Sequence, residues 1–170
     1  MNLPETLEIL IITLSDRASA GEYEDRSGPA IREKLREFFS ASEWSYNITA
    51  RIIPDNAKTL RELLTGDSGK YNIIFTTGGT GVGPKDITTA TVKPLLRKEI
   101  PGIMEFIRVK YGSVNPGALL SNGVAGITGD SLIYTLPGSV RAVNEYMSEI
   151  LKTLRHTILM QYGIDDHNGR

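Results

Sequence analysis

The chain has 170 residues, and its 19 Lys and Arg against 20 Asp and Glu give a formal net charge of -1. Its hydrophobic fraction of 40% and charged fraction of 23% are typical of globular proteins, so we expect one domain over residues 1–170 and no extensive disorder. The charge balance argues against a broad basic face for nucleic acid, and the lack of cysteine excludes disulfides, thiolate nucleophiles and cysteine zinc sites.

Two apolar segments in the first third of the chain predict strands, each followed by a helix. Residues 7–15 form a continuous run of apolar and β-branched residues, which is typical of a strand buried on both faces. Residues 46–54 alternate between polar and apolar and predict a second strand. A helix with one apolar face is expected after Ser27. The next helix follows Asp55 or Asn56, either of which is a suitable cap.

The remaining two thirds of the chain predict three more strands among helices. Residues 71–77 predict a third buried strand, and two prolines interrupt the helical pattern of residues 87–112. Residues 118–139 contain two short strands around turns rich in Gly, Asn and Asp. The clearest amphipathic helix runs from 139 to 162, and we expect the polar tail at 163–170 to be flexible.

This alternation of strands and helices predicts an α/β fold, a three-layer sandwich with a mainly parallel central sheet flanked by helices. In such sheets ligands bind at the carboxyl ends of the strands. Four loops follow predicted strands, and we expect them to share one rim. They are SDRAS at 15–19, PDN at 54–56, GGTGVGPKD at 78–86 and LPGS at 136–139.

The loop at 78–86 is the most informative segment, because four glycines stand within six positions. It fits neither the P-loop pattern nor the dinucleotide-binding pattern, since Pro84 stands where each needs another residue. Glycines nevertheless let main-chain N–H groups approach an anion closely. Hydroxyls of Thr76, Thr77 and Thr80 are further expected donors.

Lys85 and Asp86 extend this phosphate interpretation. Lys85 supplies a positive charge, and Asp86 is suited to hold a Mg²⁺ ion that bridges phosphates. The alternative is a tight turn between strand and helix, with Asp86 capping the helix that follows. The number of glycines favours phosphate binding, because a turn normally needs only one.

Other polar residues at predicted strand ends have two interpretations each. Asp55 either caps a helix or faces the phosphate site, where it and Asp86 are expected to hold magnesium. Ser15 and Asp16 either receive a base or ribose or close the loop over the first strand. His156 is interpreted as a surface residue, and Trp44 as a packing residue at a strand edge.

A membrane segment is not expected. The longest apolar run, at 9–14, is too short to span a bilayer, and the acidic residues before it are unlike a signal peptide. The two histidines lie near the C-terminal end, so a multi-histidine metal site is not expected. We therefore expect a cytoplasmic protein.

Six segments in chain order carry a resemblance to a known family. They are SDRASAGEYEDRSGP at 15–29, IPDN at 53–56, FTTGGTGVGPKDIT at 75–88, EIPGIMEFIR at 99–108, ALLSN at 118–122 and LPGSVRAVNEYM at 136–147. With them the chain resembles the molybdenum-cofactor biosynthesis family, and within it the Mog-type molybdopterin adenylyltransferases. The glycine segment marks a superfamily that includes relatives without this activity. The first segment and the chain length are similar to the stand-alone adenylyltransferase.

The resemblance implies an enzyme that binds molybdopterin and Mg-ATP, joins AMP to the terminal phosphate of the pterin and releases pyrophosphate. It implies a three-layer α/β domain assembled as a homotrimer, with a molybdenum insertase receiving the product. Asp55 and Asp86 match the family's magnesium-binding and catalytic aspartates. The expected substrate-binding residues are Ser15, Asp16, Gly78, Gly79, Thr80, Gly81, Lys85, Ser121, Pro137, Gly138 and Ser139.

The chain departs from the family pattern in two places. Thr89 and Ala90 stand where the family usually has proline and an acidic residue, and Asn122 stands where it commonly has arginine. These departures favour an alternative, a non-catalytic molybdopterin-binding module of the same fold. Retention of Asp55 and Asp86 favours the enzyme. A third interpretation, a protein acting in molybdate insertion, predicts further domains.

Overall fold

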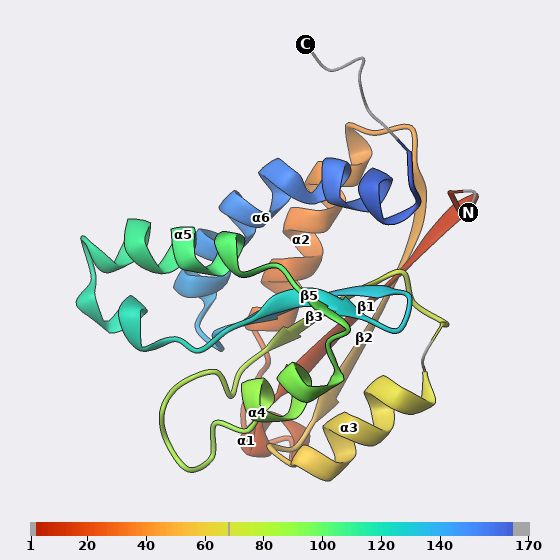
Figure 1. Ribbon diagram of the computed structural model, residues 1–170. Coiled ribbons are helices and arrows are strands. Elements are labelled where there is room, and N and C mark those ends of the chain that lie inside the picture. Colours follow the sequence, from red (N-terminus) through yellow and green to blue (C-terminus); the bar gives the residue numbers. More distant parts are fainter. Residues whose placement is uncertain (1–2, 68, 165–170) are drawn as a thin grey trace.

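The structure is a computed structural model that describes residues 3–67 and 69–164, and within them six strands form one sheet (Figure 1). The strand order is β2-β1-β3-β6-β5-β4. Strands β2, β1, β3 and β6 are parallel, whereas β5 runs antiparallel to both β6 and β4. The bounds are β1 Thr6–Leu14, β2 Ser45–Ile53, β3 Ile73–Thr77, β4 Lys98–Glu99, β5 Ala125–Thr128 and β6 Ser131–Leu136. The predicted mainly parallel sheet is confirmed.

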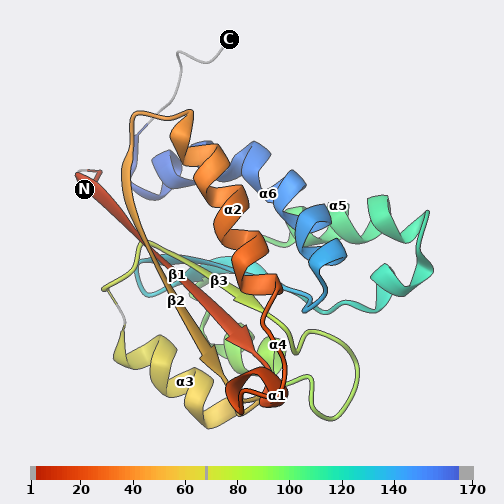
Figure 2. The same ribbon diagram turned by 180° about the vertical axis from the view of Figure 1, so that it is seen from behind.

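Helices cover both faces of the sheet, which gives the predicted three layers. Figures 1 and 2 show α2, α5 and α6 on one face and α3 and α4 on the other. The bounds are α1 Asp16–Ser19, α2 Ser27–Ser40, α3 Ala57–Gly66, α4 Thr88–Val92, α5 Pro101–Gly112 and α6 Val140–Gln161, with 3₁₀ helices at η1 Lys93–Leu95 and η2 Pro116–Leu120.

The central strand β1 explains why its sequence is apolar at nearly every position. Ile9 and Ile11 pack in the core layer under α2 and α6, while Leu10 and Ile12 pack in the layer under α3. Ile9 is paired in register with Ile48 of β2 and with Ile73 of β3. A strand covered on both faces buries alternate side chains into opposite layers, so both sets are apolar.

Two predicted helix starts differ from the structure in detail. Ser27 is the first residue of α2 and not its cap; Asp25 accepts hydrogen bonds from the main-chain N–H groups of Ser27 and Gly28. At α3 the cap is Asn56, whose side chain accepts from the N–H of Thr59 at 3.0 Å. Asp55 therefore does not take the capping role that the sequence left open to it.

The long C-terminal helix forms almost over its predicted range, with Ser139 as its cap. His156 is exposed on it, as expected, and Trp44 packs beside Phe39 just before the edge strand β2. The flexible-tail prediction falls largely on residues 165–170, which lie outside the described residues. None of the helices within residues 3–67 and 69–164 has the length and the apolar composition that a membrane span requires.

Candidate functional site

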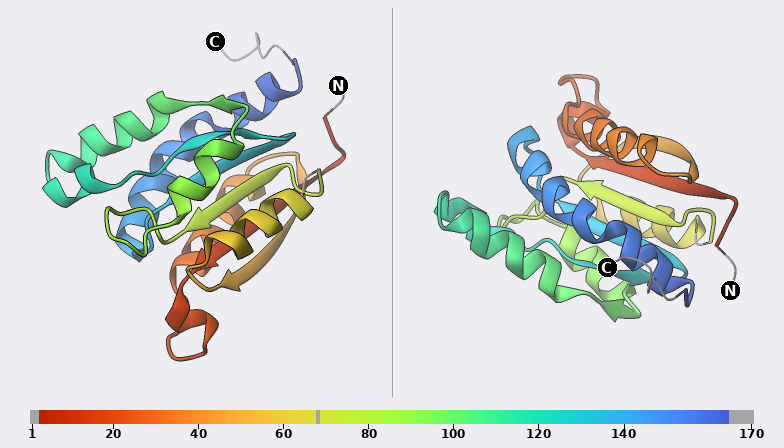
Figure 3. Two further views of the ribbon diagram at one scale, coloured as in Figure 1. Left: turned by 60° about the horizontal axis from the view of Figure 1, so that its bottom comes forward. Right: turned by 90° about the horizontal axis from the view of Figure 1, so that it is seen from above.

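The parallel strands end on one side of the sheet, and their loops contact one another there (Figure 3, left). The N–H of Ser15, after β1, donates to the carbonyl of Ile53 at the end of β2 at 3.0 Å. The N–H of Gly78, after β3, donates to the carbonyl of Leu136 at the end of β6 at 3.0 Å. The loops at 15–19, 54–56, 78–86 and 136–139 therefore share one rim.

Gly78 sits at the tightest point of this rim. Its φ is +101°, and a Cβ atom there would lie 2.4 Å from the carbonyl oxygen of Leu14. A Cβ on Gly138 would lie 3.3 Å from the Cα of Gly78. Glycine is needed at Gly78 both for the backbone conformation and for the close approach, which lets loops after three strands meet.

The glycine loop presents main-chain donors without partners. The N–H groups of Gly79, Thr80 and Gly81 donate no hydrogen bond within residues 3–67 and 69–164. Thr88 is hydrogen-bonded to two carbonyls of the glycine loop. Its N–H donates to the carbonyl of Gly79, and its hydroxyl donates to the carbonyl of Gly78. Successive free N–H groups on a fixed loop are an anion-binding arrangement.

The residues that carry these donors line a cavity of about 300 Å³, here called the loop cavity. Its lining includes Gly79, Thr80 and Gly81 on one side and residues 137–139, 141 and 142 on the other. The second side is the N-terminus of α6, a helix of 22 residues capped by Ser139. A helix N-terminus carries partial positive charge, so the loop cavity favours an anion from both sides.

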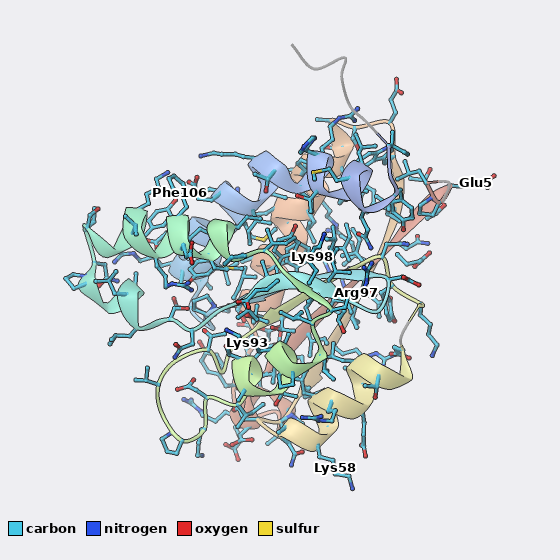
Figure 4. All side chains as sticks on the ribbon, in the orientation of Figure 1. Glu5, Lys58, Lys93, Arg97, Lys98 and Phe106 are labelled. Atoms are coloured by element: carbon cyan, nitrogen blue, oxygen red, sulfur yellow. The ribbon has the colours of Figure 1, made fainter. Side chains whose placement is uncertain are left out.

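A larger cavity of about 730 Å³, here called the cleft, adjoins the loop cavity. Its lining runs from Thr89 and Lys93 across α5 to residues 121–125. Lys93 lies between α4 and α5 in Figure 4. The two cavities share Gly81, Asp86 and Ser121, so these residues stand where a ligand in one would meet a ligand in the other.

Asp86 does not cap a helix, contrary to the structural alternative considered for it. Helix α4 begins without a side-chain cap, and Oδ2 of Asp86 accepts from the N–H of Gly83 at 2.8 Å. A Cβ on Gly81 would lie 2.7 Å from this oxygen, which shows how closely the carboxylate is held against the loop. Oδ1 of Asp86 has no hydrogen-bond partner among the described residues.

Asp55 and Asp16 form a reciprocal pair at the ends of β2 and β1. Each carboxylate accepts a hydrogen bond from the other residue's N–H, at 3.0 Å in both cases. Lys85 lies 3.5 Å from Oδ2 of Asp16 in an exposed ion pair. No hydrogen bond in the described chain joins Asp55 to Asp86; the two loops are connected through Lys85.

Ser15 and Ser139 line a third cavity, of about 350 Å³, between α1 and the start of α6. Ser15 also caps α1, accepting from the N–H of Ala18 at 3.1 Å. Tyr23 is half exposed at this cavity, with the Arg17 guanidinium over its ring. Ser15 therefore reaches a cavity besides closing its loop.

Three expected donors lie elsewhere than predicted. Thr76 and Thr77 are fully buried in β3, and the hydroxyl of Thr77 donates to the carbonyl of Pro137, so neither reaches the anion-binding surface. Their buried position follows from a strand covered on both faces. Lys85 lines none of the three cavities and points to Asp16. Thr80 does line the loop cavity.

Sequence reasoning missed the residues that surround Ser121. The hydroxyl of Tyr146 donates to Oγ of Ser121 at 2.8 Å, and Arg108 donates from Nη1 to the carbonyl of Gly123 at 3.1 Å. Burial raises the pKa of the Tyr146 phenol, although the Ser121 bond and the Arg108 charge act in the opposite direction. Periodicity places Tyr146 and Arg108 on helices but does not show that they converge.

Asn122 and Thr89, two of the departures noted in the sequence, are bonded to each other. The Thr89 hydroxyl donates to the carbonyl of Asn122 at 2.9 Å. Asn122 in turn donates from its N–H to the carbonyl of Thr80 at 2.8 Å and from Nδ2 to that of Gly81 at 3.1 Å. The segment at 121–123 is thereby fixed to the glycine loop.

Among the described residues, no group of three or more His, Cys, Asp or Glu side chains is arranged to hold a metal ion. Mg²⁺ is commonly bound by one or two carboxylates together with substrate phosphates and water. Asp55 and Asp86 each keep one carboxylate oxygen outside the hydrogen bonds above, so each has a donor of the type that Mg²⁺ binds. Asp86 lines the cleft and the loop cavity, whereas Asp55 lines none of the three cavities.

Comparison with known sequences gives one family for nearly the whole chain. The family model described as "Probable molybdopterin binding domain" matches residues 10–156. The molybdopterin adenylyltransferase of Helicobacter pylori J99 is 35% identical over 160 residues, covering 94% of this chain and 90% of the relative. That of Pyrococcus furiosus is 33% identical over 162 residues, covering 90% and 92%.

Longer relatives match over a part of their length. Gephyrin of Dictyostelium discoideum is 37% identical over 156 residues, which are 87% of this chain and 21% of gephyrin. The Drosophila melanogaster molybdenum cofactor synthesis protein cinnamon is 33% identical over 156 residues, 91% of this chain and 25% of the relative. The chain therefore spans about a fifth to a quarter of these proteins.

Solved structures agree with the sequence comparisons. A structure of MogA has a TM-score of 0.79 at 30% identity and covers 91% of this chain and 99% of MogA. The tungsten cofactor synthesizing protein MoaB of Pyrococcus furiosus has a TM-score of 0.76 at 32% identity, covering 93% and 98%.

Proposed function

The chain belongs to the molybdopterin-binding domain family of molybdenum cofactor biosynthesis, and we propose that it is a molybdopterin adenylyltransferase. In this reaction AMP passes from ATP to the terminal phosphate of molybdopterin, and pyrophosphate leaves. The product is adenylyl-molybdopterin, ready for molybdate insertion. The full-length relatives from Helicobacter and Pyrococcus carry this activity in their names, which supports the proposal.

One observation carries the proposal: Gly79, Thr80 and Gly81, whose N–H groups are unbonded within the described residues, line the same cavity as the N-terminus of α6. Both are donors suited to phosphate oxygens. The cleft beyond Asp86 has room for a second ligand of pterin size. Two adjoining cavities suit a reaction that brings two polyanions together.

The chemistry needs little from side chains that move protons. An oxygen of the pterin phosphate, already anionic near neutral pH, forms a bond to the α-phosphorus of ATP, and the bond from that phosphorus to the pyrophosphate oxygen breaks. The loop amides and the α6 N-terminus hold the phosphates in line and offset their charge. Such a site needs no cysteine, which the chain lacks, and no histidine, which does not line the three cavities among the described residues.

Mg²⁺ and ATP are part of the proposal. Asp55 and Asp86 are the residues that would hold the ion, each through the carboxylate oxygen that accepts no hydrogen bond from Asp16 or Gly83. Bound there, Mg²⁺ would neutralise charge on the phosphates. Within the chain itself, Asp86 positions the glycine loop through Gly83, while the pair of Asp16 and Asp55 fixes the neighbouring loops.

We also propose a homotrimer that passes its product to a molybdenum insertase in the cytoplasm. An exposed apolar surface supports self-association: on α5 and η2, Phe106, Val109, Leu119 and Leu120 are each more than half exposed. Phe106 lies on α5, at the upper side of this helix in Figure 4. Large exposed apolar residues gathered on neighbouring elements are typical of protein–protein contacts.

The test is a pyrophosphate-release assay with molybdopterin and Mg-ATP, in wild type and in Asp86→Asn. The amide keeps an acceptor for Gly83 but loses the charge, so we expect turnover to vanish while the unfolding midpoint is retained. Asp130→Asn, a change in the exposed turn between β5 and β6, is the matched control. Full activity of Asp86→Asn would overturn the role of Asp86. Molybdopterin binding without pyrophosphate release by wild type would identify a binding module instead.

A further inference from the structure

We infer that Arg108 is the residue that binds the phosphate monoester of the acceptor in the cleft. The inference rests on the proposed function, since it assigns the acceptor to the larger cavity and ATP to the loop cavity. Arg108 lies on α5, and it lines the cleft together with Met104 and Glu105 of the same helix. The residue is half-buried there.

The guanidinium is fixed on one side only. Nη1 donates to the carbonyl of Gly123 at 3.1 Å and makes a longer contact of 3.5 Å with that of Ser121. Nη2 and Nε donate no hydrogen bond within residues 3–67 and 69–164. A guanidinium anchored at one nitrogen keeps the rest of its planar set of donors for a ligand, in a geometry that matches phosphate.

Arg108 also differs from the other cations that line the three cavities. Those cations are paired with acids: Lys93 with Glu99 at 3.5 Å, Arg141 with Glu145 at 2.9 Å and Arg26 with Glu24 at 3.6 Å. In the described chain Arg108 forms no ion pair, not even with Glu105 one turn earlier on α5. Its charge is therefore available to an anion in the cleft.

The position relative to the glycine loop supports the assignment. The tripeptide 121–123 is bonded to Arg108 on one side and, through Asn122, to the carbonyls of Thr80 and Gly81 on the other. A phosphate bound to Arg108 would thus be separated from the glycine loop by the tripeptide 121–123. The glycine loop lines the loop cavity. Asp86 and Ser121 line both cavities between these two anion sites.

Amide NMR spectra distinguish the two anion sites without any turnover. Inorganic phosphate, titrated into wild-type protein, is expected to shift the amide signals of Gly123, which reports on the cleft, and Gly79, which reports on the loop cavity. In Arg108→Gln the Gly123 response should weaken by about tenfold or more in apparent affinity, while the Gly79 response stays. Arg97→Gln, which changes an arginine bonded to the carbonyl of Gly129 outside these cavities, is the matched control.

The variant Arg108→Lys shows whether a weaker response in Arg108→Gln comes from the lost donors or from a loss of structure. Lysine keeps the charge but not the planar donor set, so its Gly123 response should fall between those of wild type and Arg108→Gln. In the pyrophosphate assay, Arg108→Gln should raise the KM for molybdopterin about tenfold and leave the KM for ATP unchanged.

The outcomes separate this inference from the proposed function. A Gly123 response that is absent in wild type, or equal in wild type and Arg108→Gln, overturns the role of Arg108 even if adenylylation occurs. An equal loss in Arg97→Gln overturns it as well. An Arg108-dependent Gly123 response in a protein that releases no pyrophosphate supports the anion site and overturns the adenylyltransferase proposal.

Discussion

Asp16 and Asp55 each accept a hydrogen bond from the other's main-chain N–H, at 3.0 Å in both directions. Asp55 is thus committed to the rim through one carboxylate oxygen, while its neighbour Asn56 caps α3. Asp55 and Asn56 therefore have separate roles: Asp55 joins the rim and Asn56 caps the helix, although the sequence allows either residue to be the cap. The division can be tested by changing one residue at a time.

Asp55→Asn should lower pyrophosphate release by at least about a hundredfold if the carboxylate charge serves the metal, with little change in the free energy of unfolding. Asn56→Ala should do the reverse, costing about 1 kcal/mol of stability through the lost cap and leaving activity intact. Activity assays and urea denaturation of both variants measure this. Equal activity in wild type and Asp55→Asn would contradict the metal-binding role.

Gly78→Ala should lower the free energy of unfolding by about 3 kcal/mol, because strain at positive φ adds to a clash with the Leu14 carbonyl. Gly21 provides the comparison, since its φ is +75° and a Cβ atom there would meet nothing within 4 Å. Gly21→Ala should cost only about 1 kcal/mol. Denaturant unfolding measures both, and equal losses would mean that the close approach of the loops at Gly78 is not tight.

Glu149 gives the fold a specific acid sensitivity. Burial by itself raises the pKa of its carboxyl, but hydrogen bonds from Lys110, Lys152 and Tyr111 outweigh burial and lower the pKa from 4.5 to about 2. A carboxyl with a lowered pKa in the folded state stabilises fully above pH 4.5, and this contribution disappears as the pH falls toward 2.

Glu149→Gln should therefore lose about 2 kcal/mol of stability at pH 7 and show a flatter dependence of stability on pH between 4.5 and 2. Glu37→Gln, which removes an exposed ion pair with Lys34, should change stability by about 0.5 kcal/mol or less. Urea denaturation across this pH range is the measurement. A pH profile of Glu149→Gln that coincides with that of wild type would contradict the assignment.

Charges on the exposed face of α5 should weaken the proposed trimer. Phe106→Asp and Val109→Asp replace side chains of residues that are 54% and 69% exposed, so neither should unfold the monomer. We expect both variants to sediment as smaller species than wild type at micromolar concentration. Met160→Asp, at a position 64% exposed on α6, should not change the sedimentation. A monomeric wild type would contradict the trimer itself.

Most of the fold can be predicted from the sequence, because the long elements carry strong periodic patterns. The apolar run of β1 and the regular spacing on α6 each predict an element that the structure contains within a residue or two. Strand β4, with two residues, and helix α1, with four, are not predicted, since segments this short have no period to detect. Strand β4 forms by pairing with β5, whereas α1 is a single turn capped by the adjacent Ser15.

The site is predictable in part. Strand-end loops can be identified because parallel strands bring their carboxyl ends together, and Asp55 and Asp86 follow such strands. The orientation of side chains cannot be predicted from the sequence. Thr77 points inward and donates to the Pro137 carbonyl, and Lys85 points to Asp16. Arg108 ends a segment that carries the family resemblance, but its role is not evident from the sequence, because its place depends on how α5 packs beside residues 121–123.

The tripeptide 121–123 forms a common wall, bonded to Arg108 in the cleft and to the glycine loop beside the other cavity. A ligand that displaces this wall from one side changes the room and the donors on the other. Thermodynamic linkage makes such an effect mutual, so the affinity for each substrate would change by the same factor when its co-substrate is present. Only a movement of residues 121–123 on binding would couple the two pockets, and an affinity for ATP that is equal with and without molybdopterin would exclude such coupling.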